Sequence, residues 1–202
     1  MKKVDVVVIG GSAAGIPAAI TCRRHYPEKS VMLIRKEKQV QIPCGIPYIF
    51  GTVNSPDNNL IPDAAVTGKG IDLIVDEAEK INREEKKVIT KNGETIEYDK
   101  LILATGSTPL HLPIPGLDKK NVFKVKKDTP YLHNLLEEMN DKKDVVILGG
   151  GFIGVEFADE CKKNRDANVT IVELLPHCLM LAFEDEFCKE AEEVLKQRGI
   201  DL

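Results

Sequence analysis

The sequence has little of what marks nucleic-acid-binding or membrane-spanning proteins. Its densest basic cluster is the short group Lys124, Lys126 and Lys127, and the formal net charge is −4. Proteins that bind a phosphate backbone need clustered lysine and arginine, so nucleic acid is not expected as a partner. No apolar segment approaches the roughly 20 residues of a membrane span, so no membrane is expected either. At 43% hydrophobic and 30% charged residues, the composition predicts an ordinary globular protein.

Cysteines are few and are not arranged in pairs. The five are Cys22, Cys44, Cys161, Cys178 and Cys188, an odd number without a C-x-x-C pair. This arrangement fits neither a disulfide framework nor a zinc site, so no bound metal is expected. Free thiols indicate a reducing compartment, and we therefore expect a cytoplasmic protein.

A first glycine-rich turn lies near the N-terminus. Residues 4–9 are almost all apolar and β-branched, as in a buried parallel strand, and lead directly into Gly10-Gly11-Ser12-Ala13-Ala14-Gly15. A helix and a second strand at residues 30–34 follow, which gives the strand, turn, helix, strand order that binds a pyrophosphate. Two positions depart from the dinucleotide pattern. Ser12 replaces its second glycine, and Arg35 stands where an acidic residue would bind ribose.

The pattern recurs in full further along the chain. Residues 144–148 predict a buried strand, and Gly149-Gly150-Gly151-Phe152-Ile153-Gly154 satisfies G-x-G-x-x-G. A helix and a strand at residues 169–172 follow, and Glu173 stands about 20 residues after the last glycine. A carboxylate there accepts hydrogen bonds from the ribose hydroxyls and repels a 2′-phosphate. NADH is therefore favoured over NADPH.

Shorter elements separate the two signatures. An Asn-Gly pair at residues 92–93 predicts a hairpin turn, and a further buried strand ends in small residues at Ala104-Thr105-Gly106. Prolines and a glycine at residues 113–116 indicate a boundary. The strands are expected at residues 71–75, 81, 87–90, 95–97 and 101–106, and an amphipathic helix is expected at residues 129–139.

These motifs together resemble a known family. Two glycine turns about 140 residues apart, with Tyr-Asp-Lys-Leu-Ile-Leu-Ala-Thr-Gly-Ser at residues 98–107, resemble the FAD- and NAD-dependent pyridine nucleotide-disulfide oxidoreductases. Pro-Cys-Gly-Ile-Pro-Tyr at residues 43–48 is similar to the single-cysteine branch. That branch contains coenzyme A-disulfide reductases, NADH-dependent persulfide reductases and NADH oxidases.

The resemblance implies a fold and its division into domains. It implies an α/β protein with tandem Rossmann-like FAD- and NAD(P)-binding domains of the three-layer β-β-α sandwich type. Residues 1–117 would form the first segment of the FAD domain, and residues 118–202 the N-terminal half of an incomplete NAD domain. Family members continue beyond this point and are homodimers through a C-terminal domain that this sequence lacks. We therefore expect the chain to be the N-terminal part of such an enzyme.

The resemblance also assigns site residues. Arg24 aligns with a residue that contacts coenzyme A in the disulfide reductases, so it is the candidate substrate residue. The residues implied for FAD are Gly10, Ser12, Ala13, Ala14, Gly15, Arg35, Pro43, Cys44, Ala78, Ala104, Thr105 and Gly106. Those implied for NAD are Gly149, Gly151, Phe152, Ile153, Gly154, Glu156 and Glu173. At the Arg35 position, either Glu37 takes over the ribose contact or the adenosine is held through backbone with Arg35 packed against it.

Cys44 is the candidate redox residue. Pro43 before it and the apolar stretch after it suggest that Cys44 opens a short helix, whose dipole would favour the thiolate that attacks sulfur. Three functions remain open: reduction of a disulfide or persulfide by NADH through FAD and Cys44, reduction of oxygen or peroxide through a Cys44 sulfenic acid, and a nucleotide-binding fragment without catalysis. The structural alternative for Cys44 is a small buried hydrophobe.

The 202-residue chain by itself is expected to bind FAD weakly or not at all, and to be inactive alone. Two chain segments build the FAD site in the family, and only the first is in this sequence. Gel filtration of the purified chain with added FAD tests this expectation. Flavin absorbance that stays with the protein at one equivalent per chain would contradict it.

Overall fold

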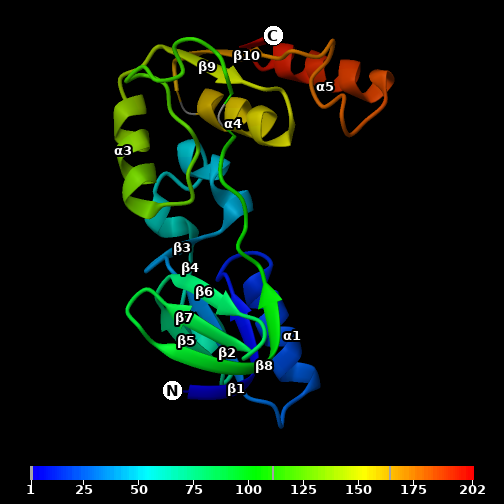
Figure 1. The fold of residues 1–202 in the computed structure, drawn as a ribbon. Coiled ribbons are helices and arrows are strands. Elements are labelled where there is room, and N and C mark those ends of the chain that lie inside the picture. Colours follow the sequence, from blue (N-terminus) through cyan, green and yellow to red (C-terminus); the bar gives the residue numbers. More distant parts are fainter. Residues whose placement is uncertain (1, 111, 164) are drawn as a thin grey trace. The chain divides into compact units, whose positions relative to one another are not determined.

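The computed structural model describes residues 2–110, 112–163 and 165–202. Two compact units make up the chain, and both are discontinuous in sequence. Unit 1 contains Met1–Pro43 and Leu60–Thr129, and unit 2 contains Cys44–Asn59 and Pro130–Leu202. Figure 1 labels their elements. The division into nucleotide-binding domains at residues 117 and 118 stays a prediction.

Unit 1 is built on a six-stranded sheet in the order β5-β2-β1-β8-β7-β6. Strands β5, β2, β1 and β8 are parallel, and β7 and β6 continue the sheet antiparallel. The strands are β1 (Lys2–Ile9), β2 (Val31–Arg35), β5 (Asp72–Val75), β6 (Ala78–Asn82), β7 (Lys87–Thr90) and β8 (Thr95–Leu103), with a small pair β3 (Val40–Gln41) and β4 (Leu60–Ile61) beside them. The helices are α1 (Gly15–His25) and α2 (Ala64–Thr67).

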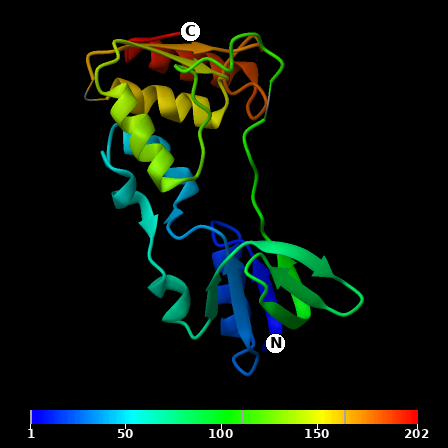
Figure 2. The same cartoon turned by 60° about the vertical axis from the view of Figure 1, so that its left-hand side comes forward.

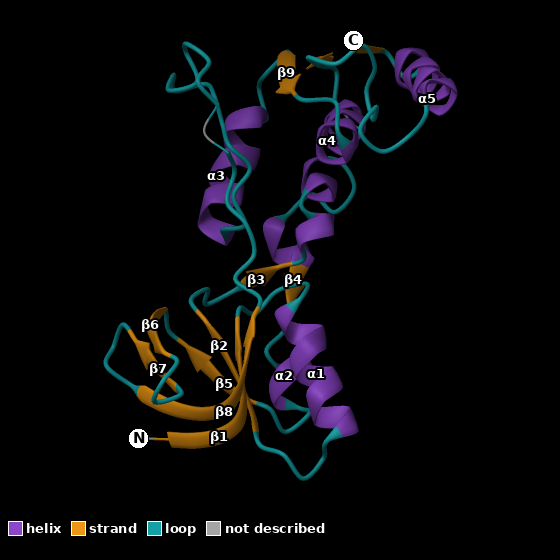
Figure 3. Cartoon of the chain, turned by 45° about the vertical axis from the view of Figure 1, so that its right-hand side comes forward, coloured by secondary structure: helices purple, strands orange, loops and turns teal. Residues whose placement is uncertain are grey.

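Alternation along the strands gives unit 1 a core on each face of its sheet. Side chains of neighbouring strand residues point to opposite faces. In β1, Val7 and Ile9 join the β7 and β8 residues Val88 and Ile96 in one core. Val8 joins Ile16, Ala19 and Val66 of the two helices in the other. The hairpin β6–β7 and the helices therefore cover opposite faces (Figure 3), as the β-β-α type predicts.

Unit 2 has a three-stranded parallel sheet in the order β11-β10-β9. Its buried face carries Val169, Ile171 and Ile200. The strands are β9 (Asp144–Leu148), β10 (Asn168–Val172) and β11 (Ile200–Asp201), and the helices are α3 (Thr129–Met139), α4 (Phe152–Lys162) and α5 (Asp185–Gln197). Residues 44–59 join this unit, with the 3-10 helices η2 (Pro47–Phe50) and η3 (Pro56–Asn59), and η1 (Pro43–Gly45) begins at the unit boundary.

Most of the predicted elements are present, and two differ. The α/β class with Rossmann-like units is confirmed, β9 and α3 match their predicted bounds, and the Asn-Gly turn is present with Gly93 at a φ of +87°. The strands predicted separately at residues 95–97 and 101–106 are one strand, β8, which ends at Leu103. Asp99 and Lys100 lie between the two predicted strands, and both are exposed while the backbone continues its pairing with β1.

The helices, the possible metal ligands and the cysteines of the described residues bear on the predictions about membranes, metals and thiols. None of the helices in residues 2–110, 112–163 and 165–202 has the length and apolar character needed to cross a bilayer. Within the same residues, His, Cys, Asp and Glu side chains form no group of three or more placed to hold a metal ion. Cys161, Cys178 and Cys188 are buried, Cys22 is half-buried and Cys44 is exposed.

Asp5 of β1 is expected to make folding stability depend on pH. Its carboxylate accepts hydrogen bonds from the Ser30 amide (2.9 Å) and hydroxyl (2.8 Å) and from Lys29 Nζ (3.0 Å). These bonds, that from the Ser30 amide foremost, lower the pKa of Asp5 to about 2. The stabilisation is therefore complete above the pKa of an unfolded aspartate and is lost as the pH falls toward 2.

Urea unfolding of Asp5→Ala at neutral and acid pH tests this. The variant should unfold at lower urea than the wild type at neutral pH, and the difference should shrink in acid. Asp72→Ala, at an exposed position of edge strand β5, is the control that should change little at either pH. An Asp5 effect of equal size at both pH values would contradict the role of its ionisation.

Candidate functional site

The first glycine turn joins β1 to α1 and leaves no room for a side chain at its first and last positions, Gly10 and Gly15. Gly10 has a φ of +112°, and its amide donates to the carbonyl of Ile34 at 2.8 Å. A Cβ on Gly10 would lie 2.0 Å from the carbonyl oxygen of Ala104, and one on Gly15 would lie 1.7 Å from that of Gly10. Both contacts are to backbone, which cannot move aside. The turn thus brings three of the implied FAD residues into direct contact.

The second glycine turn, between β9 and α4, repeats this geometry. Gly149 has a φ of +103° and donates its amide to the carbonyl of Val172 at 2.9 Å. A Cβ on Gly154 would lie 1.8 Å from the carbonyl oxygen of Gly149. The two turns, one in each unit, therefore share the contact between their first and last glycines, although a Cβ on Gly149 would meet nothing within 4 Å. Each turn places the start of a helix at the end of a parallel strand, but β9 is half-buried to exposed along its length, so the prediction of a buried strand at residues 144–148 is wrong.

The middle position of the turn differs between the two. Gly151 occupies it in the second turn, where a Cβ would meet nothing within 4 Å. Ser12 occupies it in the first turn, and its buried Oγ lacks a hydrogen-bond partner within the described part of the chain. A buried hydroxyl is unfavourable unless it makes a hydrogen bond, and a phosphate oxygen at a helix N-terminus would accept one from it. The residues of the first turn therefore fit a dinucleotide pyrophosphate.

Arg35, at the end of β2, is fully engaged with protein groups. A Cβ on Gly11 would lie 2.6 Å from Arg35 Cδ, so the arginine stem packs directly under the turn. The guanidinium donates to the carbonyls of Glu37 (2.9 Å) and Lys38 (3.2 Å) and pairs with Asp63 Oδ1 at 2.5 Å. Arg35 therefore packs against the turn, as one of the two predicted arrangements has it, while the nucleotide contacts in both arrangements stay predictions.

Glu173 takes the corresponding position in the second turn. Its carboxylate accepts from the amide of Leu175 at 2.8 Å and from that of Gly150 at 2.5 Å. These backbone hydrogen bonds, that from Leu175 first, hold the pKa of Glu173 below its ordinary range. The group is therefore charged at neutral pH. Each carboxylate oxygen can accept more than one hydrogen bond, so both remain able to bind ribose hydroxyls.

A support beneath the second turn was not predicted from the sequence. A Cβ on Gly150 would lie 2.5 Å from Cys178 Sγ, and the Leu179 amide donates to the Gly150 carbonyl at 2.8 Å. Glu192 of α5 accepts from the Cys178 amide at 2.9 Å and lies 3.2 Å from His177 Nδ1. No local pattern indicates these contacts, because they join residues far apart in the sequence. Burial raises the pKa of the Cys178 thiol.

The remaining implied residues of unit 1 lie on several elements. Ala78 begins β6 and pairs with Thr90. Thr105 and Gly106 follow β8, with the Thr105 amide beside Gly10 and Gly106 at a φ of +73°. Ala13 and Ala14 lie just before α1, and Arg24 lies in the last turn of this helix. Pro43 is the last residue of the first chain segment of unit 1.

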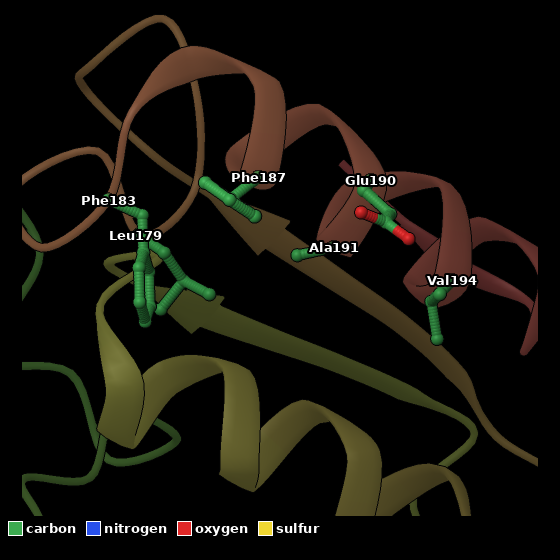
Figure 4. Close-up of a pocket in the computed structure, with 6 residues that line it drawn as sticks. All are labelled: Leu179, Phe183, Phe187, Glu190, Ala191 and Val194. Carbon is green, nitrogen blue, oxygen red and sulfur yellow. The ribbon is translucent and has the colours of Figure 1, made fainter.

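Of the implied residues of α4, Phe152 contacts a residue that lines an apolar pocket in unit 2. Phe152 and Ile153 begin α4 and are exposed, and Glu156, one turn on, is exposed as well. The Phe152 ring meets the Phe183 ring edge-on at 5.8 Å. Figure 4 shows the side chains that line the pocket, which come from α5 and from the residues just before it. The pocket has a volume of about 350 Å³, and it is lined by Leu179, Phe183, Phe187, Glu190, Ala191 and Val194.

Cys44 is exposed and lies in unit 2. The helix expected to open at Cys44 is instead the three-residue 3-10 turn η1, and η2 begins only at Pro47. So short a turn cannot build a helix dipole, which removes that part of the argument for an activated thiolate. The exposure excludes the alternative of a buried hydrophobe and leaves the sulfur open to small molecules.

Comparison with known proteins yields consistent matches. The sequence model of the pyridine nucleotide-disulphide oxidoreductase family matches residues 4–202. An NADH oxidase of Methanocaldococcus jannaschii is 33% identical over 97% of this chain and 46% of its own length. A CoA-dependent NAD(P)H sulfur oxidoreductase of Pyrococcus abyssi is 36% identical over 96% of this chain and 45% of its own.

Solved structures agree with these matches. The NAD-dependent persulfide reductase of A. fulgidus superposes with a TM-score of 0.85 at 30% identity, over 98% of this chain and 39% of that one. A ferredoxin reductase of Rhodopseudomonas palustris gives 0.86 at 28% identity, over 98% of this chain and 49% of that one. The chain thus spans about half the length, or less, of the proteins that it matches.

Two alanine substitutions in the second turn should differ in their effect on the free energy of unfolding, because only one of the two glycines is in close contact with backbone. Gly154→Ala forces a Cβ against the Gly149 carbonyl and should cost about 1–3 kcal/mol of unfolding free energy, or more, through overpacking. Gly151→Ala meets open space at a φ of −74° and should cost less than about 1 kcal/mol, the scale of a changed N-cap. Urea unfolding measures both, and equal losses would contradict this reading of the turn.

Proposed function

Since the chain belongs to the pyridine nucleotide-disulphide oxidoreductase family, we propose that it is the N-terminal, nucleotide-binding part of an NADH- and FAD-dependent reductase of disulfides or persulfides. The observation that carries the proposal is a pair of glycine turns, one per unit, that share the contact between the first and last glycine, together with an exposed Cys44. In this proposal, residues 1–117 are the first segment of an FAD domain and residues 118–202 the first half of an NAD domain.

Each turn is assigned one nucleotide. The Gly10–Gly15 turn, with the unpartnered Ser12 hydroxyl and the adjoining Ala104–Gly106 segment, holds the FAD pyrophosphate. The turn at residues 149–154 and the Glu173 carboxylate hold NADH, and the charge of Glu173 disfavours the 2′-phosphate of NADPH. When bound, FAD supplies the transfer of two electrons between a nicotinamide and sulfur.

Cys44 is proposed to attack the substrate. As a thiolate, it attacks one sulfur of a disulfide, the sulfur–sulfur bond breaks, and the other half leaves as a thiolate. The mixed disulfide on Cys44 then takes up two electrons that originate from NADH, which frees the second thiol and restores the Cys44 thiolate. Relatives named as CoA-dependent sulfur and persulfide reductases support a coenzyme A-linked sulfur as the substrate. Arg24 is the proposed contact for coenzyme A.

A second candidate function is NADH oxidase, which the names of relatives in Methanocaldococcus jannaschii and Enterococcus faecalis favour. Here oxygen first takes up two electrons that originate from NADH, together with two protons, and becomes hydrogen peroxide. The Cys44 thiol then takes one oxygen atom from the peroxide and becomes a sulfenic acid, with release of water. Two electrons and two protons then return it to the thiol with release of a second water. Both candidate functions use the same exposed thiol and differ only in the acceptor.

Substitution of Cys44 tests the proposed role of this thiol. In the protein as its cells make it, Cys44→Ser should lower NADH-driven turnover of coenzyme A disulfide and of persulfide at least about a hundredfold, because the hydroxyl cannot form a mixed disulfide. Cys22→Ser, at a half-buried cysteine of α1, is the control that should retain activity. Turnover that persists in Cys44→Ser would contradict the assignment.

Measurement of both acceptors side by side decides between the two functions. Oxygen consumption and coenzyme A-disulfide reduction are followed with the same enzyme at the same NADH concentration. A reductase turns over the disulfide faster than it consumes oxygen, and an oxidase does the reverse. Rapid oxygen consumption with no disulfide turnover would replace the first proposal with the second.

A further inference from the structure

The segment that carries Cys44 is attached to helix α4, more than 100 positions away in the sequence. Residues 44–59 and α4 lie in the same unit, and η2 packs directly on the helix (Figure 2). The Phe50 and Phe157 ring centroids are 5.2 Å apart. A Cβ on Gly51 would lie 2.3 Å from the Glu160 carbonyl oxygen, so the backbone of the segment touches the backbone of the helix.

Glu160 is the polar centre of this contact. Its side chain is only 3% exposed, and a buried carboxylate is costly unless its oxygens are satisfied. Thr52 Oγ1 donates to Oε2 at 2.7 Å, across 108 positions of sequence. Lys163 Nζ pairs with Oε1 at 2.5 Å, and this hydrogen bond is the main cause that raises the pKa of Lys163. Both carboxylate oxygens of Glu160 therefore accept a hydrogen bond.

The contact is also directional. Apolar packing of Phe50 on Phe157 would tolerate sliding, whereas the Thr52 hydroxyl reaches Glu160 in one register only. Lys163 Nζ lies 5.9 Å from the Tyr48 ring centroid and so adds a second contact to the same turn. The turn itself is closed by amides of Thr52 (2.9 Å) and Val53 (2.8 Å) that donate to the Tyr48 carbonyl.

We propose that Glu160 is a positioning residue for Cys44: through Thr52 it fixes the segment at residues 44–53 on the helix that begins at the second glycine turn. The significance for catalysis rests on the proposed function of Cys44. One helix then carries the proposed NADH turn at its N-terminus and the support of the thiol-bearing segment in its C-terminal half.

The mobility of a nitroxide spin label on Cys44 tests this positioning directly. A Cys22→Ala background confines the label to Cys44, because Cys161, Cys178 and Cys188 are buried. Thr52→Val keeps the side-chain shape but removes the donor to Glu160, and Glu160→Gln keeps an acceptor for Thr52 while it removes the charge. We expect the immobile component of the spectrum to fall clearly in Thr52→Val and less in Glu160→Gln.

Hydrogen exchange supplies the second measurement. The Thr52 and Val53 amides should exchange about tenfold faster in Thr52→Val, the scale of one lost hydrogen bond to a charged group. Amides of β9 and β10 should be unchanged, which shows that the unit remains folded. Asp185→Asn is the control for the loss of a helix carboxylate, because Asp185 of α5 pairs with Lys189 of the same helix.

The outcomes separate the positioning role of Glu160 from the proposed redox role of Cys44. A spectrum and exchange rates in Thr52→Val and Glu160→Gln that match the wild type would overturn the role of Glu160. So would faster exchange at residues 52 and 53 with no change in label mobility, since Cys44 would then be held by other contacts. Neither measurement depends on turnover, so a failed Cys44→Ser test would leave them standing.

Discussion

The close approach of a helix to a strand end is the constraint on which both units depend. In each glycine turn, the last glycine lies so near the carbonyl of the first that a methyl group would overlap it. This contact lets the helix begin within a few residues of the strand. A helix N-terminus at the end of a strand is a position at which a phosphate can bind. The binding geometry therefore follows from how tightly the backbone packs.

The two turns show that this constraint acts on the backbone and leaves the side chains free to vary. The contact between the first and last glycine is nearly the same in both, although the middle residue is Ser12 in one and Gly151 in the other. The residues at the strand ends, Arg35 and Glu173, have opposite charge. Arg35 turns its guanidinium to Asp63, whereas Glu173 turns its carboxylate to the Gly150 amide. The two sites thus differ in the side chains that would distinguish one ligand from another, and they agree in the backbone contact that lets the helix begin close to the strand.

Sequence patterns predicted the local parts of this arrangement. The turns, the hairpin at Gly93 and helix α3 depend on neighbouring residues, so their signals are contained in short stretches. Contacts between distant residues were missed, because a single sequence does not show which distant residues touch. Examples are the Cys178 support beneath Gly150 and the Thr52–Glu160 hydrogen bond. The helix expected at Cys44 failed for a local reason, since Gly45 and Pro47 end the first turn at once.

The attachment of residues 44–59 to α4 also sets an order of events during synthesis. A ribosome releases the chain from its N-terminus, so Ile49 and Phe50 emerge roughly a hundred residues before the helix that buries them. Until then the segment is a loop with apolar side chains and no core. The two glycine turns can each form from one continuous stretch of chain. Attachment of the thiol-bearing segment must wait until α4 has been made, which makes it a late step of folding.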